Sequence, residues 1–133
     1  MLRIYTDGAC RGNPGPSAIA FIILNDRKKV IKRRSKYVGI GTNNQAEYEA
    51  LISALTSALK FGNDVKCYSD SKLLVNQMNG DWKVKHPNMK LLWKKAMRLT
   101  REFREITFTH IPRTNPKIRK VDALANAELD EIE

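Results

Sequence analysis

Four acidic residues are placed where their side chains could act together. Asp7 and Asp70 each follow a short β-compatible run, and Glu47 and Asp122 lie near the start of segments with helical periodicity. Carboxylates held close together raise one another's pKa values unless cations neutralise them. Hard oxygen ligands with no histidine or cysteine nearby suit magnesium or manganese better than zinc. The pattern therefore predicts a site for divalent metal.

Each acid also has a purely structural interpretation. The pair formed by Asp7 and the glycine after it is an ordinary turn sequence, and Asp70 could cap a following helix. Glu47 and Asp122 could do no more than complement a helix dipole, an effect of about 1 kcal/mol at most on a protein surface. Two predicted strands that both end in aspartate are harder to explain in this way.

The elements that must position these acids begin with strands. Apolar and β-branched runs predict five of them, over residues 2–6, 18–24, 30–38, 65–69 and 106–111. Short polar turns join the first three, which predicts an antiparallel meander. A helix between the third and fourth strands would place the fourth parallel to the first. Asp7 and Asp70 would then end at the same edge of the sheet, where ligands bind in open α/β folds.

Helices are predicted between and after these strands. Thr42 opens the first with a capping box completed by Gln45, and Gly62 ends it. A short helix follows Ser71, and a longer one starts at Pro87. A polar loop over residues 112–120 then precedes a final helix, which begins at residue 121 and carries its acid in the first turn. These helices would bring Glu47 and Asp122 to the same edge.

Composition points to a polyanionic partner. The chain has 133 residues, the length of one domain, with 42% apolar residues and a formal net charge of +10. Seven of the ten residues 27–36 are Lys or Arg, eight more lie within residues 83–104, and a third group lies within 113–120. A solvated charged face could explain any one cluster. Three clusters favour nucleic acid over an anionic membrane.

The same composition bears on the compartment. No run of eighteen apolar residues and no signal-peptide pattern occurs, which predicts an intracellular, cytoplasmic protein without a membrane partner. Cys10 and Cys67 lack metal-ligand spacing and are predicted to be free thiols.

Four motifs carry a family resemblance. In chain order they are YTDGACRGNPGP, TNNQAEYEAL, YSDSKLLVNQMNG and VDALAN. At these separations they resemble a type 1 ribonuclease H, in particular the compact archaeal-like form, over nearly the whole chain. The resemblance implies an α/β fold with a five-stranded mixed sheet, three strands antiparallel and two parallel, flanked by helices. It also implies one catalytic domain over residues 1–133. The implied activity is endonucleolytic cleavage of the RNA strand of RNA/DNA hybrids, leaving 5′-phosphate and 3′-hydroxyl ends.

The resemblance assigns the metal ligands as well. It places the family's four acidic ligands on Asp7, Glu47, Asp70 and Asp122, around two magnesium or manganese ions. Asp7 would bridge both ions, Asp122 would complete the site that activates water, and Glu47 with Asp70 would hold the other. Two ions about 3.5–4 Å apart suit phosphodiester hydrolysis, because one generates the nucleophile and the other stabilises the leaving oxygen.

Substrate contacts are implied at further positions. Asn13, Asn43 and Asn44 match residues that contact the RNA strand, where side-chain amides read 2′-hydroxyls across a minor groove. Thr42 matches a contact to a phosphate of the DNA strand.

Other basic and polar residues are candidates for the same substrate. Ser71 and Lys72 follow the catalytic acid, and Lys72 stands where many relatives have Gln. The basic protrusion of some bacterial members is missing. Part of its contact with the DNA strand is expected to be replaced by Lys83, Lys85, Lys90, Lys94 and Lys95.

The loop before the last acid departs from the family pattern. Many relatives carry a histidine there that aids proton transfer or product release, whereas this loop has none. Arg113 is the candidate substitute. The loop from Arg113 to Asp122 is also expected to be a few residues longer than usual.

Two other functions stay open at the level of sequence. The chain could be a non-catalytic hybrid-binding module, although all four acids are present. It could also be a DNA-cutting recombinase or junction resolvase of the same superfamily, which would not need Asn13, Asn43 and Asn44. The sequence does not decide whether double-stranded RNA is also a substrate, and nothing in it demands more than a monomer.

Overall fold

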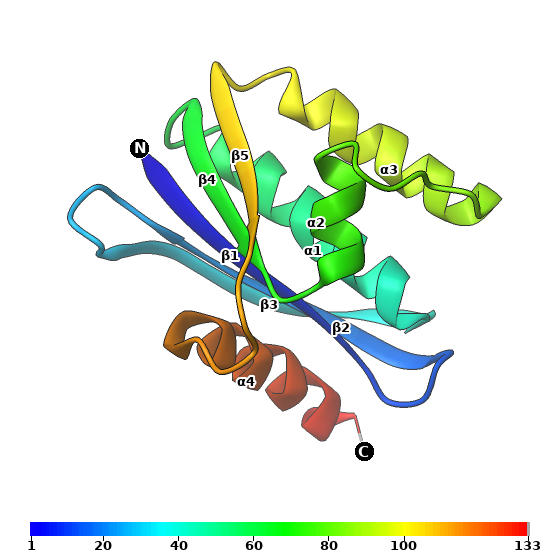
Figure 1. Cartoon of the computed structure of the whole chain (residues 1–133). Helices are drawn as coiled ribbons and strands as arrows, with labels where there is room; N and C mark the ends of the chain where they lie inside the picture. Colours follow the sequence, from blue (N-terminus) through cyan, green and yellow to red (C-terminus); the bar gives the residue numbers. More distant parts are fainter. Residues whose placement is uncertain (133) are drawn as a thin grey trace.

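The computed structural model describes residues 1–132 and contains one sheet and four helices (Figure 1). The strands are β1 (Leu2–Cys10), β2 (Gly15–Leu24), β3 (Val30–Gly41), β4 (Asp64–Ser69) and β5 (Glu105–His110). The helices are α1 (Asn43–Ala58), α2 (Lys72–Met78), α3 (Pro87–Thr100) and α4 (Pro116–Glu131). Within residues 1–132, none of the helices has the length and apolar character needed to cross a membrane.

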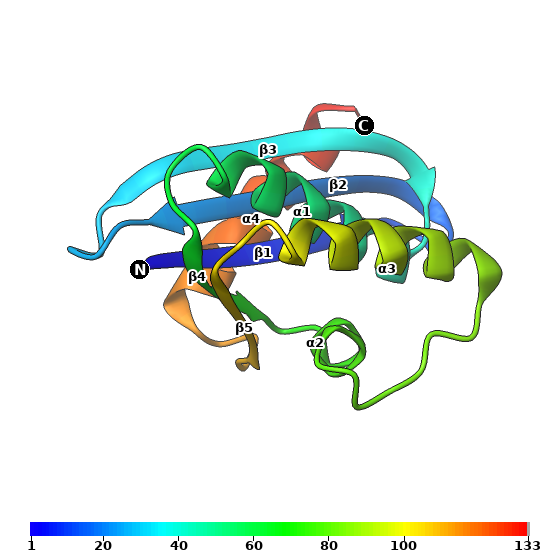
Figure 2. The ribbon, with the colours of Figure 1, turned by 90° about the horizontal axis from the view of Figure 1, so that it is seen from above.

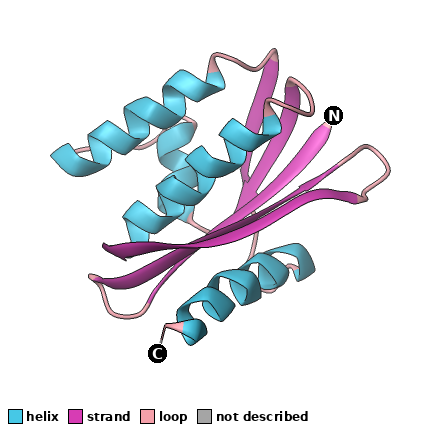
Figure 3. Cartoon of the chain, turned by 180° about the vertical axis from the view of Figure 1, so that it is seen from behind, coloured by secondary structure: helices cyan, strands magenta, loops and turns pink. Residues whose placement is uncertain are grey.

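The sheet confirms the predicted topology. Its strand order is β3-β2-β1-β4-β5, in which β1 pairs antiparallel with β2, and β2 antiparallel with β3. β4 is parallel to both β1 and β5. α1 and α3 lie on one face of the sheet and α4 lies on the other (Figures 2 and 3). This is the five-stranded mixed sheet with flanking helices that the resemblance implies.

The core has two parts because β2 is buried on both faces. Phe21 and Ile23 pack with α1, α3 and the strands beside them, and Ile22 and Leu24 pack with α4 on the other side. All four side chains are almost completely buried. A strand covered on both faces carries a continuous apolar run instead of an alternating one, which is the pattern of residues 18–24.

β1 is longer than predicted, and this changes the position of Asp7. The strand continues to Cys10, because its antiparallel pairing with β2 extends as far as Cys10 opposite Ser17. The prediction that Asp7 ends a strand is therefore wrong. Its parallel pairing with β4, however, stops at Tyr5 opposite Tyr68. Asp7 lies just beyond that point, at the carboxyl edge of the parallel part of the sheet.

α4 starts earlier than predicted. Residues 116–120 belong to the helix, so the expected loop over 112–120 is wrong in its second half. Asn115 is the N-cap, and its Oδ1 accepts hydrogen bonds from the backbone N–H groups of Lys117 at 2.9 Å and Ile118 at 3.4 Å. Asp122 consequently lies in the second turn and not in the first. Complementation of the helix dipole, which fades beyond the first turn, is no longer a sufficient explanation for it.

Removal of this cap should destabilise the protein measurably. Replacing Asn115 with Ala leaves two backbone N–H groups of α4 without their acceptor, and we expect a loss of about 1 kcal/mol in the free energy of unfolding. Urea denaturation would measure it. Asn63→Ala, which alters an exposed asparagine between α1 and β4, is the matched control and should change stability little. Equal unfolding free energies for the two variants would contradict the cap.

Candidate active site

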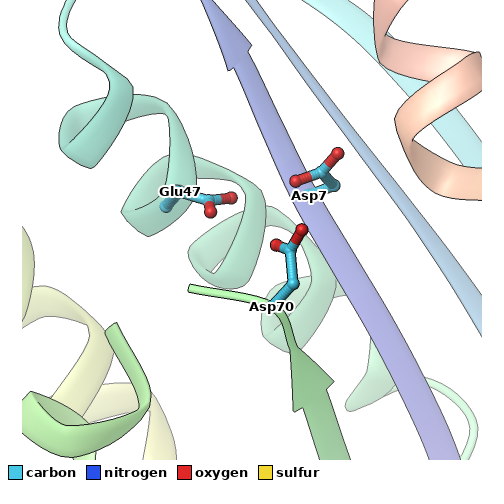
Figure 4. A group of neighbouring side chains, drawn as sticks. All are labelled: Asp7, Glu47 and Asp70. Carbon is cyan, nitrogen blue, oxygen red and sulfur yellow. The ribbon is translucent and has the colours of Figure 1, made fainter. Parts of the chain in front are cut away.

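Three acidic side chains from three different elements meet at one point. Asp7 comes from β1, Glu47 from α1, and Asp70 follows the last residue of β4 (Figure 4). Each offers a carboxylate oxygen, and these three oxygens lie within 4.8 Å of one another. The predicted convergence of Asp7 and Asp70 at one edge of the sheet is therefore present, with Glu47 beside them.

Glu47 is held by the close approach of α1 to β1. The backbone N–H of Gly8 donates a hydrogen bond of 2.6 Å to Oε1 of Glu47. The predicted capping box is present at the start of α1, where Thr42 Oγ1 accepts from the N–H of Gln45, and the Gln45 side chain accepts from the N–H of Thr42. The helix is thereby fixed with Glu47 one turn from its amino end. Gly8 was not a predicted site residue. Its position directly after Asp7 in the sequence was the signal that its backbone would lie beside the site.

Asp70 lies at the junction of β4 and α2. The residue after it, Ser71, caps α2 by accepting a hydrogen bond from the N–H of Leu74. Ser69 Oγ accepts from the N–H of Ser71 and tightens the turn around Asp70. Nε of Arg113 lies 3.6 Å from Oδ2 of Asp70. Since the Arg113 side chain is 89% exposed, this ion pair contributes little to stability.

Asp122 borders the same cavity from the opposite side of the sheet. The cavity has a volume of about 640 Å³ and is lined by all four predicted acids. Asp122 is close enough to Asp7 to affect its protonation. Nδ2 of Asn126 donates to Oδ1 of Asp122 at 3.2 Å and to the backbone carbonyl of Asp122 at 3.0 Å. Asn126 was missed in the sequence, although a partner four residues along a helix is a readable signal.

Burial and the crowding of carboxylates together set the electrostatics of this cavity. Burial is the largest effect on Asp7 and raises its pKa, and the negative charges of Glu47 and Asp70 raise it further. Asp7 is only 4% exposed. Burial likewise raises the pKa of Glu47, and the charge of Asp70 adds to the effect. Asp7 is buried, Glu47 and Asp70 are partly buried, and Asp122 is exposed. Acids gathered in this way, with Arg113 as the single arginine among the residues that line the cavity, form a ready site for cations.

The donor atoms fit a hard divalent ion. The converging ligands are carboxylate oxygens, which magnesium and manganese prefer. The expectation that no cysteine lies nearby is wrong, because Cys10 also lines the cavity. Its thiol donates to the backbone carbonyl of Gly41, with 3.2 Å between the sulfur and the oxygen.

The residues predicted to contact substrate fall into two groups. Asn43, Asn44 and Ser71 line the acidic cavity. Asn13 and Thr42, again with Asn44, line a neighbouring cavity of about 390 Å³. Oδ1 of Asn13 accepts a hydrogen bond of 3.1 Å from the N–H of Asn43, which ties the loop after β1 to the start of α1. The three asparagines therefore form one polar rim beside the acids.

The predicted lysines lie outside these cavities. Lys72 is the first residue of α2, and Lys83 and Lys85 lie between α2 and α3. All three are exposed. They extend the basic surface of the protein. None of them is among the residues that line the acidic cavity.

Comparison with known proteins gives a family match over most of the chain. Residues 5–128 match the family described as reverse transcriptase-like. The chain belongs to the reverse transcriptase-like family. It is 38% identical over 131 residues to the ribonuclease HI of Halobacterium salinarum, an alignment that covers 98% of this chain and 65% of that relative. The chain thus spans less than two thirds of the length of this relative.

Solved structures confirm the resemblance to type 1 ribonucleases H and the fold that it implied. The crystal structure of the Halobacterium salinarum ribonuclease H1 matches with a TM-score of 0.93 at 37% identity, covering 98% of each chain. The LC11 ribonuclease H1, solved in complex with an RNA/DNA hybrid, matches with a TM-score of 0.92 at 38% identity, covering 99% of each chain.

Proposed function

We propose that this chain is an endonuclease that hydrolyses the RNA strand of RNA/DNA hybrids, with residues 1–133 forming the catalytic domain. The observation that carries the proposal is the convergence of Asp7, Glu47 and Asp70 within 4.8 Å, inside a cavity that Asp122 also lines. The relatives support it, since they are ribonucleases H and one was solved with a hybrid.

The acids would hold two divalent ions of magnesium or manganese. When bound, such ions activate water and stabilise the oxygen that leaves the phosphorus, so that the products carry 5′-phosphate and 3′-hydroxyl ends. Asp7 is central because it is the most buried of the four acids and interacts with each of the others. Gly8 orients the carboxylate of Glu47, and Asn126 orients that of Asp122. The chain itself therefore supplies a prearranged set of oxygen ligands.

The polar rim would select RNA in one strand. Asn43 and Asn44 line the acidic cavity, Asn13 lines the neighbouring cavity, and all three carry side-chain amides that can hydrogen-bond 2′-hydroxyl groups. Thr42 would contact a phosphate of the DNA strand with its remaining hydrogen-bonding capacity, since its Oγ1 already accepts from the N–H of Gln45.

The other contacts follow from position. Ser71 and Lys72 would contact the substrate beside the acids, and Lys83 and Lys85 would contact the DNA strand from the exposed segment between α2 and α3. Activity on double-stranded RNA, a monomeric state and a cytoplasmic location stay predictions.

Cleavage of an end-labelled RNA/DNA hybrid tests the proposal. RNA duplex, DNA duplex and single strands are assayed beside it, with magnesium or manganese, for wild type, Asp70→Asn and the control Asp81→Asn. Asp81 is exposed and does not line the acidic cavity. We expect metal-dependent cleavage of the RNA strand by wild type and the control, and none by Asp70→Asn.

The same assay separates the alternatives. Tight hybrid binding without cleavage in either metal would contradict catalysis and indicate a hybrid-binding module. Cleavage of DNA duplex or branched DNA in preference to the hybrid would indicate a recombinase or resolvase.

Arg113 is proposed to assist turnover, in the place of the histidine found in many relatives. Its guanidinium lies beside Asp70 at the mouth of the cavity and is free to move, being 89% exposed. Arg113→Ala should lower kcat about 100-fold, the lower end of what a group that assists proton transfer supplies, while hybrid affinity changes less than about threefold, because Arg113 is one exposed cation among many. Single-turnover and steady-state kinetics measure the effect. Arg119→Ala, an exposed arginine outside the cavity, should leave kcat unchanged. An unchanged kcat for Arg113→Ala would contradict the proposed role of Arg113 in turnover.

A further inference from the structure

Part of one sheet face is left open by the helices. α4 packs against β1, β2 and β3. On the same face, the outward side chains of β4 and β5 are at least partly exposed, including Lys66, Tyr68 and Thr107. Figure 1 shows β4 and β5 extending away from α4. This region is on the far side of the sheet from α1 and α3.

Two tyrosines stack on this open face. The rings of Tyr5 on β1 and Tyr68 on β4 lie with centroids 4.9 Å apart and an interplanar angle of 18°. They are directly paired in the parallel register, so their side chains point the same way. Both rings are only partly buried. The pair therefore presents aromatic surface to solvent on a rigid part of the sheet.

A basic cleft surrounds the tyrosine pair. It has a volume of about 400 Å³, within the range of about 300–1,000 Å³ that is usual for small-ligand sites. Its lining includes Arg3, Lys28 and Lys117 together with Tyr5 and Tyr68. No acidic side chain lines it, and among residues 1–132 none of the three cations forms an ion pair. Scattered solvated lysines would explain the charge alone, but not its concentration around stacked aromatic rings.

The cleft is separate from the acidic cavity. Tyr5 precedes Asp7 by two residues and Tyr68 precedes Asp70 by two, so each tyrosine lies about 7 Å along its strand from a catalytic acid. The segment over residues 111–115 lies between the basic cleft and the acidic cavity. Ile111 and Asn115 border the basic cleft, whereas Arg113 borders the acidic cavity.

We propose that this cleft is a second nucleic-acid site, which binds an unpaired single strand by stacking a base on the Tyr5–Tyr68 pair. Backbone phosphates would be bound by Arg3, Lys28 and Lys117. Aromatic platforms flanked by cations are the general means by which proteins bind single strands without sequence preference. The base of a nucleotide has a flat face that can stack on a tyrosine ring. The phosphate of the nucleotide is negatively charged and would neutralise the positive charge of the cleft.

Binding of a fluorescent oligothymidylate, followed by anisotropy in EDTA, tests this site. Oligothymidylate contains no RNA, so the result does not depend on the proposed catalysis. Loss of one stacked base in Tyr68→Leu should weaken binding about 5- to 100-fold, whereas Tyr68→Phe should bind like wild type. Tyr37→Leu, an exposed tyrosine on β3, is the matched control. Equal affinities for Tyr68→Leu and Tyr37→Leu would overturn the proposal.

Salt dependence and cross-linking provide independent measurements. Lys117→Gln should reduce the slope of log K against log salt by about 0.7, which corresponds to one phosphate contact on a single strand, and the control Lys60→Gln should not. Irradiation of wild type with an oligonucleotide that carries 5-iodouracil should link Tyr5 or Tyr68, as mapped by mass spectrometry. This measurement needs no variant to fold. Cross-links confined to the side of the sheet that carries α1 and α3 would overturn the site.

Discussion

Asp7→Asn should abolish RNA cleavage and at the same time stabilise the metal-free protein at neutral pH. Asp7 is buried against Glu47 and Asp70, and its pKa is raised by burial first and by these charges second. At neutral pH the folded chain must keep this carboxyl protonated while the unfolded chain ionises it, and asparagine removes that cost because it does not ionise. Because we propose Asp7 as the central metal ligand, its replacement should cost more activity than the 10- to 100-fold that is typical of groups that only orient ligands.

The sign of the pH dependence follows from the raised pKa. Below about pH 4, near the ordinary value of 3.8, Asp7 is protonated in both folded and unfolded chains and carries no penalty. As the pH rises further, the unfolded chain ionises while the folded chain resists ionisation. The metal-free wild type should therefore lose stability, by on the order of 1 kcal/mol per pH unit. The slope should be shallower for Asp7→Asn.

Urea denaturation in EDTA between about pH 4 and pH 8 measures this slope, and repetition with magnesium completes the test. Magnesium should stabilise wild type much more than Asp7→Asn. Bound magnesium offsets the cost of placing the acids together, and the variant has already lost part of that cost along with one of the proposed ligands. Asp26→Asn is the matched control. Asp26 is held by the N-terminal amino group at 2.6 Å, which lowers its pKa, so its removal should bring no stabilisation at neutral pH. A metal-free Asp7→Asn that is less stable than wild type at pH 8 would refute the proposed repulsion.

Gly8→Ala should destabilise the fold and reduce activity together. A Cβ at this position would lie 2.5 Å from the carbonyl carbon of Ala46 and 2.6 Å from the backbone nitrogen of Glu47. These are backbone atoms of α1 and cannot rotate away, so β1 and the helix must separate. We expect a loss of about 1–3 kcal/mol in the free energy of unfolding. Displacement of Glu47 by about 1 Å should lower kcat about a hundredfold.

Urea denaturation in EDTA and hybrid cleavage with magnesium measure the two effects. Gly62→Ala is the matched control, because its Cβ would meet only the side chain of Leu2, with Cδ1 at 3.4 Å and Cγ at 3.6 Å, which are ordinary contact distances. That variant should retain activity and nearly all of its stability. If Gly8→Ala matched Gly62→Ala in both measurements, the close approach of α1 to β1 would have no functional importance.

Local signals in the sequence were sufficient for much of the fold. The capping box at Thr42 and Gln45, the apolar run 18–24 and the position of Asp70 after a β-compatible run each state a local preference that the structure keeps. The error at the end of β1 arose because a distant partner decides where that strand ends, whereas the error at the start of α4 did not. β1 runs on to Cys10 because β2 is there to pair with it, although the local sequence is rich in turn residues. The start of α4 at Asn115 and Pro116 was readable, since an asparagine cap before proline is a local signal.

The sequence by itself determined the order of the elements, because local patterns set helix and strand preferences. It also determined which four acids are candidates for the site and the excess of basic charge, because both are properties of the residues themselves. Only the tertiary structure decided how close the acids come. Asp7, Glu47 and Asp70 converge because β4 returns parallel to β1 and α1 lies against Gly8, contacts between segments far apart in the chain. The raised pKa values follow from that packing, since burial and mutual repulsion exist only once the segments are assembled. The same assembly places Tyr5 against Tyr68, an arrangement that no local pattern could indicate.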